Sequence, residues 1–186
     1  MIEVKNAPKI GLNMDDYHHL IADRVAQLSH LFGRPVDYIE VGVLTGNSAK
    51  AVLSTGMIAH ATLVDNFSNT HCGETKSSPE IVERNLAAYD GLFTIAVGDS
   101  RNVLPLISGS GQQFDVGFVD GEHTDAACWD DMANMWPLIR EGGVMFVDDL
   151  RNPVSLTGVV ERFAFEHGLT MKTHDVHNGL GELTRK

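Results

Sequence analysis

The feature that most constrains the fold is an alternation of short apolar segments with helical patterns. Five segments of about five or six residues carry the continuous β-branched and aromatic runs typical of buried parallel strands. They are VDYIEV (36–41), ATLVD (61–65), FTIAV (93–97), FDVGFVD (114–120) and GVMFVDD (143–149). Helical spacing fills the gaps at 47–56, 79–90, about 101–108 and 124–139. The alternation predicts an α/β fold, a doubly wound parallel sheet with helices on both faces.

The segments on either side of this alternation predict helices and a hairpin. Apolar residues recur at helical spacing over about 14–32, and Asn13 is the expected N-cap. Beyond residue 150 we expect a helix around 155–167 and a hairpin formed by LTMKTHDV and LGELTRK. The length of 186 residues suits one domain. Its expected parts are an N-terminal helical segment (1–35), a core (36–150) and a C-terminal helix with hairpin (151–186).

Charge and composition exclude several partners. The formal net charge is −11, which argues against a nucleic-acid duplex or an anionic membrane as the main partner, because both bind through Lys and Arg patches. The apolar runs are too short to span a bilayer, and the N-terminus lacks the apolar core of a signal peptide. We therefore expect a cytoplasmic protein, in which the distant Cys72 and Cys128 are reduced thiols.

Acidic residues stand at the carboxyl end of every predicted strand. They are Glu40, Asp65, Asp99, Asp120 and the pair Asp148–Asp149. In a doubly wound sheet these ends meet at one edge, and ligands bind there where the strand order reverses. Acids at all five ends predict a site that holds cations or sugar hydroxyls.

The loop after the first predicted strand, "EVGVLTGNS", has the pattern G-x-x-x-G. Gly42 allows a tight turn, and Gly46 allows a ligand to approach the backbone just before Asn47 or Ser48 caps a helix. A plain strand-to-helix turn explains the spacing equally well. No Lys-Ser/Thr follows as in a phosphate-binding P-loop, and Glu40 would repel the pyrophosphate of a dinucleotide.

With its acids, the segment "YIEVGVLTGNSA" resembles the first motif of class I S-adenosylmethionine-dependent methyltransferases. In that family an acid about 25 residues downstream, here Asp65, binds both ribose hydroxyls, and a segment like "VGDS" (97–100) contacts adenine. The resemblance implies a Rossmann-like sheet in the order 3-2-1-4-5-7-6 with an antiparallel last strand. It implies these cofactor-binding residues: Glu40, Gly42, Gly46, Ser48, Asp65, Asp99, Ser100 and Asp120.

The pattern "DGEH" and the pair "DD" resemble the metal-dependent O-methyltransferases. Those of the catechol and caffeoyl-CoA type carry one Asp after the fourth strand and an Asp-Asn or Asp-Asp pair after the fifth. The resemblance implies that Asp120, Asp148 and Asp149 hold Mg²⁺ or another divalent cation. In the sugar and macrolide O-methyltransferases Asp-Gly-x-His recurs, which implies His123 as the catalytic base. The acceptor would be a hydroxyl of a small molecule, and the chain a homodimer by analogy.

Several alternatives remain open. A nicotinamide-dependent oxidoreductase would share the fold, although the chain lacks G-x-G-x-x-G and a Tyr-x-x-x-Lys dyad. A relative that binds the adenosyl ligand without turnover would share the cofactor motifs. A nucleic-acid methyltransferase is disfavoured by the charge and by the absence of an Asn/Asp-Pro-Pro-Tyr motif.

Four further interpretations concern single segments. The Met and Trp stripe at 129–136 predicts core packing. Asp130 and Asp131, in the middle of a helix, predict a solvated face. His174 and His177 are interpreted as surface residues. The polar segment 66–79 is either an exposed connection or part of the acceptor pocket.

Overall fold

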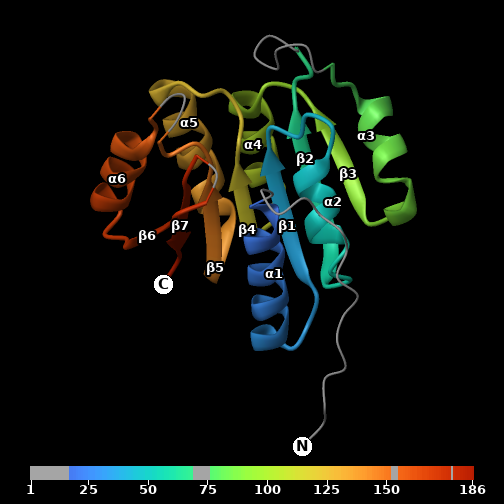
Figure 1. Cartoon of the computed structure of the whole chain (residues 1–186), viewed down its shortest axis with the longest axis horizontal. Helices are drawn as coiled ribbons and strands as arrows, with labels where there is room; N and C mark the ends of the chain where they lie inside the picture. The colour runs from blue at the N-terminus through green and yellow to red at the C-terminus, as the bar shows by residue number, and fades with distance from the viewer. Residues whose placement is uncertain (1–16, 69–75, 152–154, 177) are drawn as a thin grey trace, which may run out of the picture.

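The computed structural model describes residues 17–68, 76–151, 155–176 and 178–186. Its helices and strands alternate along the chain (Figure 1). In chain order they are α1 (His18–Phe32), β1 (Val36–Val41), α2 (Asn47–Leu53), β2 (Ile58–Asp65), α3 (Pro79–Asn85), β3 (Phe93–Val97), α4 (Ser100–Gly109), β4 (Phe114–Val119), α5 (Asp125–Met135), β5 (Ile139–Val147), α6 (Thr157–Glu166), β6 (Met171–His174) and β7 (Leu180–Thr184).

One seven-stranded sheet has the order β3-β2-β1-β4-β5-β7-β6, which confirms the predicted topology. The first five strands are parallel, and β7 is antiparallel to both of its neighbours. The chain builds β2 and β3 on one side of β1 and then crosses to β4 on the other. The strand order therefore reverses between β1 and β4, which is where such sheets bind ligands.

The helices bury two apolar cores, one on each face of the sheet. One core joins α1, α2 and α3 to the sheet, and in Figure 1 α1 and α2 lie in front of the strands. The other core joins α4, α5 and α6, and it contains Met132 and Met135 with Trp129 and Trp136 packed against it. This confirms that the Met and Trp stripe is core. No helix among the described residues is long and apolar enough to cross a membrane.

Several boundaries differ from the sequence expectation. The predicted helix at 124–139 ends at Met135 and continues as a 3-10 turn, because Pro137 has no N–H to donate to a helix. The predicted helix at 79–90 ends at Asn85, and 47–56 ends at Leu53. Strand β3 is only partly buried because it is the edge of the sheet. The expected N-cap Asn13 lies outside the described residues.

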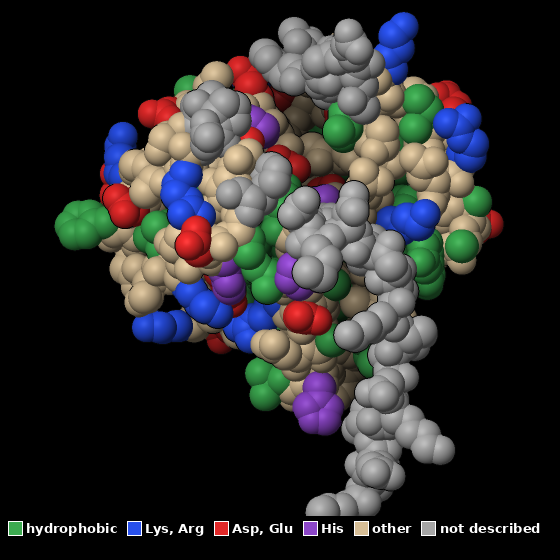
Figure 2. All heavy atoms as spheres, viewed as in Figure 1, with side chains coloured by type: hydrophobic (Ala, Val, Ile, Leu, Met, Phe, Trp, Pro, Cys, Tyr) green, Lys and Arg blue, Asp and Glu red, His purple; other side chains and the backbone are tan. Residues whose placement is uncertain are grey.

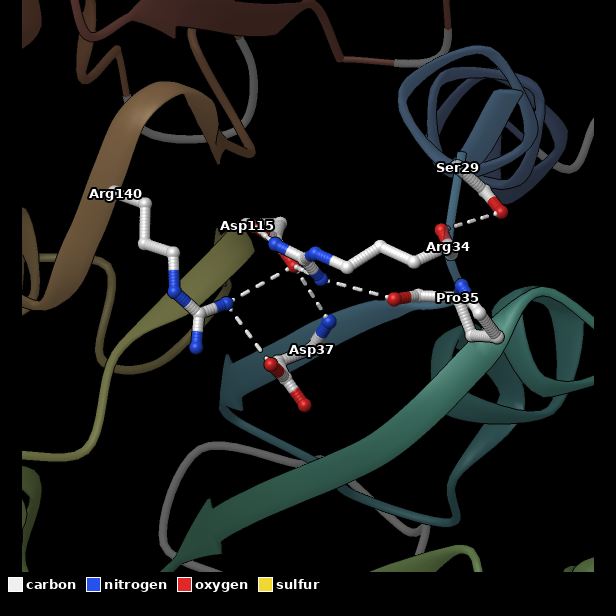
Figure 3. A network of polar contacts seen from close by, with 6 residues as sticks. All are labelled: Ser29, Arg34, Pro35, Asp37, Asp115 and Arg140. Carbon is white, nitrogen blue, oxygen red and sulfur yellow. Dashed lines mark hydrogen bonds and ion pairs between the residues drawn. The ribbon is translucent and has the colours of Figure 1, made fainter. Parts of the chain in front are cut away.

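An ionic network around the buried Asp115 connects the strands at the amino-terminal end of the sheet (Figure 3). The two terminal guanidinium nitrogens of Arg34 donate to the two carboxylate oxygens of Asp115, at 2.9 and 2.8 Å. Arg140 lies 2.9 Å from Asp37 and 3.1 Å from Asp115, whose side chain is 1% exposed. The network ties α1, β1, β4 and β5 together at the end of the sheet opposite the acidic edge.

Candidate functional site

A pocket of about 830 Å³ opens at the carboxyl edge of the sheet. Its walls come from the ends of β1, β2, β4 and β5 and from the first turns of α4 and α5. Figure 2 shows acidic and histidine side chains gathered in the hollow along this edge. The volume is within the range of small-molecule and cofactor sites.

The glycine loop brings two strand ends into direct contact. Gly42, at φ +88°, donates its N–H to Val64 O at 3.0 Å. A Cβ built on Gly42 would lie 1.8 Å from the carbonyl oxygen of Asp120, so only glycine fits there. Gly46, at φ +84°, is itself the N-cap of α2, with no side-chain cap. The expectation that Asn47 or Ser48 caps this helix is therefore wrong.

Glu40 does not reach the pocket. It is fully buried, where its carboxylate accepts hydrogen bonds from the hydroxyls of Ser48 and, at 2.8 Å, Tyr38. Among the described residues that line the pocket, Glu40, Gly46 and Ser48 do not occur. The structure therefore places these three residues behind the pocket wall, while direct contacts between them and a cofactor remain a prediction. Burial raises the pKa of Glu40 to about 8.

Glu40→Gln is expected to remove a pH dependence of stability. The folded protein binds the Glu40 proton more tightly than the unfolded chain, whose ordinary pKa is 4.5. The stabilisation is therefore complete below pH 4.5 and is lost as the pH rises toward 8. Each tenfold difference in proton affinity is worth about 1.4 kcal/mol. Between pH 5 and pH 9 the free energy of unfolding of Glu40→Gln should therefore rise by at least about 1 kcal/mol relative to that of the wild type. Urea unfolding at both pH values measures this, and parallel curves for the two proteins would contradict it.

Asp65 lines the pocket and also shapes it. One carboxylate oxygen accepts from the N–H groups of Val43 and Leu44 at 2.8 and 2.9 Å, and the other accepts from Phe67 N–H at 2.7 Å. Leu44 and Phe67 have φ of 52° and 51°, a region that costs a non-glycine residue energy. The three hydrogen bonds offset that cost and hold the loop open around the pocket.

The segment 97–100 contributes Asp99 and Ser100 to the pocket lining, and Asp131 lies beside them. Asp99 caps α4 by accepting from Arg101 N–H at 3.0 Å, and it also pairs with the Arg101 guanidinium. The hydroxyl of Ser100 donates to Asp131 Oδ1 at 2.5 Å. Asp131 is 3% exposed and lines the pocket, so the prediction of a solvated face is wrong for this residue. Burial raises the pKa of Asp131 to about 6.

The far end of the pocket gathers the residues predicted to be metal ligands and base. His123 lies between two carboxylates, with Nδ1 2.8 Å from Asp149 and Nε2 3.4 Å from Asp120. Tyr17 donates its hydroxyl to Asp148, and Asn178 donates to Asp149 at 2.7 Å. All of these side chains line the pocket. The structure thus brings together Asp120, Asp148, Asp149 and His123 from the ends of β4 and β5.

The electrostatics of this cluster set the protonation state of His123. Hydrogen bonds to Asp120 and Asp149 raise the pKa of His123 to about 10, so the imidazole is protonated at neutral pH. Burial, partly opposed by His123, raises the pKa of Asp120 to about 7. A protonated imidazole is not a base until a ligand or cation separates it from these carboxylates. Among the described residues, no group of three or more His, Cys, Asp or Glu side chains is arranged to hold a metal ion.

Three residues of the pocket escaped the sequence analysis. Asp131 belongs to the buried stripe of α5, and its spacing from Cys128 and Met135 was a signal for burial. Tyr17 stands one helical turn before Ile21 on the buried side of α1. Nothing in the sequence pointed to Asn178, because the hairpin places it next to Asp149.

Three smaller expectations also have an outcome. His174 is not a surface residue: its side chain is 17% exposed and its Nε2 lies 2.8 Å from Glu182. Cys128 is a free, buried thiol. His177 and Cys72 lie outside the described residues.

Comparison with known proteins gives a family and a fold. Residues 39–150 match the family described as methyltransferase domain. No curated protein matches the chain. Solved structures that superpose on it include the O-methyltransferase NovP (18% identity, TM-score 0.69, 90% of this chain and 79% of that one). A second is the Burkholderia thailandensis 1,6-didemethyltoxoflavin-N1-methyltransferase (14% identity, TM-score 0.64, 92% of this chain and 80% of that one). A third is the Podospora anserina methyltransferase PaMTH1 bound to S-adenosylhomocysteine (14% identity, TM-score 0.62, 90% of this chain and 78% of that one).

Proposed function

Because the chain belongs to the methyltransferase-domain family, as a class I S-adenosylmethionine-dependent methyltransferase, we propose that it methylates a hydroxyl group of a small molecule. The observation that carries the hydroxyl preference is the cluster of His123 with Asp120 and Asp149 at one end of the pocket. A hydroxyl nucleophile must lose its proton, and this cluster supplies proton acceptors beside the reacting group. Residues 36–150 would form the cofactor-binding core.

The cofactor would lie along the carboxyl edge of the sheet. Gly42 gives it close access to the backbone, and the carboxylates of Asp65, Asp120 and Asp149 suit the ribose hydroxyls, the ammonium and the sulfonium. The positive sulfonium and ammonium would be attracted by this acidic pocket, whereas the pyrophosphate of NAD would be repelled. Among the described residues, no feature of the pocket favours the oxidoreductase alternative.

In the proposed reaction the protein aligns the acceptor oxygen with the sulfonium methyl and takes its proton. His123 becomes a base when the acceptor enters between it and Asp120, because the pKa of the imidazole falls as this carboxylate partner is lost and its Nε2 proton leaves to solvent. Asp149, hydrogen-bonded by Asn178, then holds the imidazole through Nδ1 and leaves Nε2 to face the substrate. Tyr17 would close the pocket on the acceptor side, where its hydroxyl contacts Asp148.

A divalent cation is a further part of the proposal. Asp120, Asp148 and Asp149 supply the oxygen ligands that Mg²⁺ prefers, and they line one wall of the pocket. The arrangement of the described residues is not that of a finished metal site, since His123 bridges Asp120 and Asp149. The donor chemistry fits, and a bound cation would hold the acceptor oxygen and lower its pKa.

Chelation tests the cation. We expect EDTA to abolish methyl transfer and Mg²⁺ to restore it, because the acceptor oxygen would lose its ligand. Millimolar MgCl₂ should also raise the Tm of the wild-type protein by a few degrees through binding to the folded state. Asp148→Asn should abolish that rise. Full turnover in EDTA together with an unchanged Tm would exclude a catalytic cation.

Calorimetry with S-adenosylhomocysteine, and then NAD, tests the function itself. We expect the first ligand to bind and NAD not to bind. His123→Ala should retain the affinity for S-adenosylhomocysteine and lose about 10²–10⁴-fold in turnover with an acceptor found in a panel of hydroxylated compounds. His30→Ala, on the exposed face of α1, is the matched control and should behave as wild type. Unchanged turnover in His123→Ala would remove His123 from the chemistry, and tight binding without any transfer would favour a non-catalytic relative.

A further inference from the structure

Asp149 has an unusual backbone conformation at the point where the pocket meets the C-terminal hairpin. Its φ is +54°, in the left-handed region that costs a non-glycine residue energy, and its side chain lines the pocket. A residue keeps such a conformation only where the surrounding structure holds it. The contacts that hold Asp149 therefore also decide the shape of this end of the pocket.

The turn between β6 and β7 is fastened to the chain directly after Asp149. The N–H of Leu150 donates to Gly179 O at 3.1 Å, and the N–H of Arg151 donates to Asn178 O at 2.8 Å. Gly179, at φ +89°, packs so closely that a Cβ on it would lie 3.2 Å from Leu150 Cβ. These contacts place the turn beside the pocket at a fixed height.

One side chain of this turn reaches the pocket. Asn178 lines it, and its side-chain amide donates to Asp149 Oδ1 at 2.7 Å. The other oxygen of Asp149, Oδ2, lies 2.8 Å from His123 Nδ1. The Asp149 side chain is 7% exposed, so its protein neighbours rather than water determine its orientation.

The direction of these hydrogen bonds orders the three side chains. A carboxylate only accepts, and an amide NH₂ group only donates. Asn178 therefore fixes one oxygen of Asp149 and leaves the other to accept from the Nδ1–H of His123. Rotation of the carboxylate would disturb both contacts together. The orientation of the imidazole thus depends on Asn178, through Asp149.

The second contact of His123 is the looser one. Its Nε2 lies 3.4 Å from Asp120 Oδ1, against 2.8 Å between Nδ1 and Asp149. In the proposed reaction the acceptor enters between His123 and Asp120. The contact with Asp149 then remains to hold the imidazole, and Asn178 remains to hold Asp149.

We infer that Asn178 is a positioning residue: the turn between β6 and β7 places it so that it orients Asp149 and, through Asp149, the imidazole of His123 for methyl transfer. The inference rests on the proposed function, in which His123 faces the acceptor. It gives the C-terminal hairpin a part in the chemistry, although the hairpin lies outside the cofactor-binding core. A misplacement of about 1 Å at a reacting group can cost about 10²-fold in rate.

NMR signals of the carbon-bound histidine ring protons test the orientation without an acceptor. His123→Ala identifies the His123 signals among those of the nine histidines. Asn178→Ala should move them, because the imidazole turns. The matched control Asn134→Ala removes an amide hydrogen bond of 2.8 Å to Asp130 O on α5 and should leave them in place. In an Asp149→Ala background, Asn178→Ala should move them no further, because Asn178 acts through Asp149.

Kinetics separate positioning from a general structural role. With an acceptor found in the panel, Asn178→Ala should lower kcat about 10-fold or more and leave both KM and the affinity for S-adenosylhomocysteine unchanged. Asn178→Asp has the same size but replaces the donor with a second carboxylate, and it should lower kcat at least as much. If the panel yields no acceptor, the NMR result decides the question.

Two results would overturn the inference while S-adenosylhomocysteine binding still supported the proposed function. One is a set of His123 signals that stays in place in Asn178→Ala. The other is a wild-type kcat in that variant. A wild type that did not bind S-adenosylhomocysteine would overturn both the inference and the proposed function.

Discussion

Gly42→Ala is expected to distort the pocket severely, although it removes none of the polar side chains that line it. The added Cβ would lie 1.8 Å from the carbonyl oxygen and 2.4 Å from the carbonyl carbon of Asp120, where real Cβ contacts stay beyond 3.0 Å. Both colliding atoms are backbone at the ends of adjacent, paired strands, so no side-chain rotation relieves the clash. The end of β4 must move, and Asp120 and His123 move with it.

We expect at least a 100-fold loss of affinity for S-adenosylhomocysteine, together with a lower Tm. Part of the decrease in Tm comes from the backbone conformation, because φ +88° is costly for alanine. Gly33→Ala is the matched control: its φ is +65°, and nothing lies within 4 Å of the added Cβ. It should cost about 1–2 kcal/mol in stability and leave the affinity for the ligand unchanged. Wild-type affinity in Gly42→Ala would show that β1 and β4 do not approach as described.

Asp115→Ala is expected to cost about 2–3 kcal/mol of unfolding free energy, because several hydrogen-bond donors lose their shared acceptor. Its carboxylate accepts from Arg34, the N–H of Asp37 and Arg140. Removing it leaves Arg34 and the N–H of Asp37 without this acceptor, while Arg140 keeps its contact with Asp37 at 2.9 Å. For a chain of this size the loss corresponds to roughly 10 °C in Tm. The pocket lies at the opposite edge of the sheet, so S-adenosylhomocysteine affinity measured well below the Tm should be retained.

The pH dependence of the Asp115 effect has a definite sign. Burial by itself would raise the pKa of Asp115, but hydrogen bonds from Arg34, Asp37 N–H and Arg140 hold it below its ordinary value of 3.8. The stabilisation is therefore present above pH 3.8 and disappears as the pH falls through the lower, folded-state pKa. The difference in unfolding free energy between the wild type and Asp115→Ala should become smaller as the pH falls. Urea unfolding from pH 7 to pH 3 measures it.

An exposed ion pair is the control for the Asp115 experiment. Glu166 pairs with Arg162 at 2.8 Å on the outer face of α6, and solvent screens the pair. Glu166→Ala should therefore cost less than about 1 kcal/mol. If Asp115→Ala lowered the free energy of unfolding no more than Glu166→Ala does, the network at Asp115 would not stabilise the amino-terminal end of the sheet.

The sheet could be predicted from the sequence because strands that are buried on both faces must be apolar along their whole length. A strand such as 114–119 is apolar throughout, and this pattern is local enough to be recognised without a structure. Helix capping is also local: the Thr124 hydroxyl just before α5 accepts from Ala127 N–H at 3.2 Å. The end of α5 could not be read from the sequence in the same way. Pro137 disfavours the helix, but the packing of its neighbours also affects the residue at which the helix stops.

The sequence by itself also determined which acids share the binding edge, because parallel strands place their carboxyl ends together. What each acid does there was decided by the tertiary structure alone. Glu40 turns inward to Ser48, Asp65 holds the glycine loop, and Asp131 reaches the pocket from the middle of a helix. The protonation of His123 likewise depends on Asp149, which a separate strand brings to 2.8 Å. Burial and the nearest charge set these roles, and both depend on chain segments far apart in the sequence.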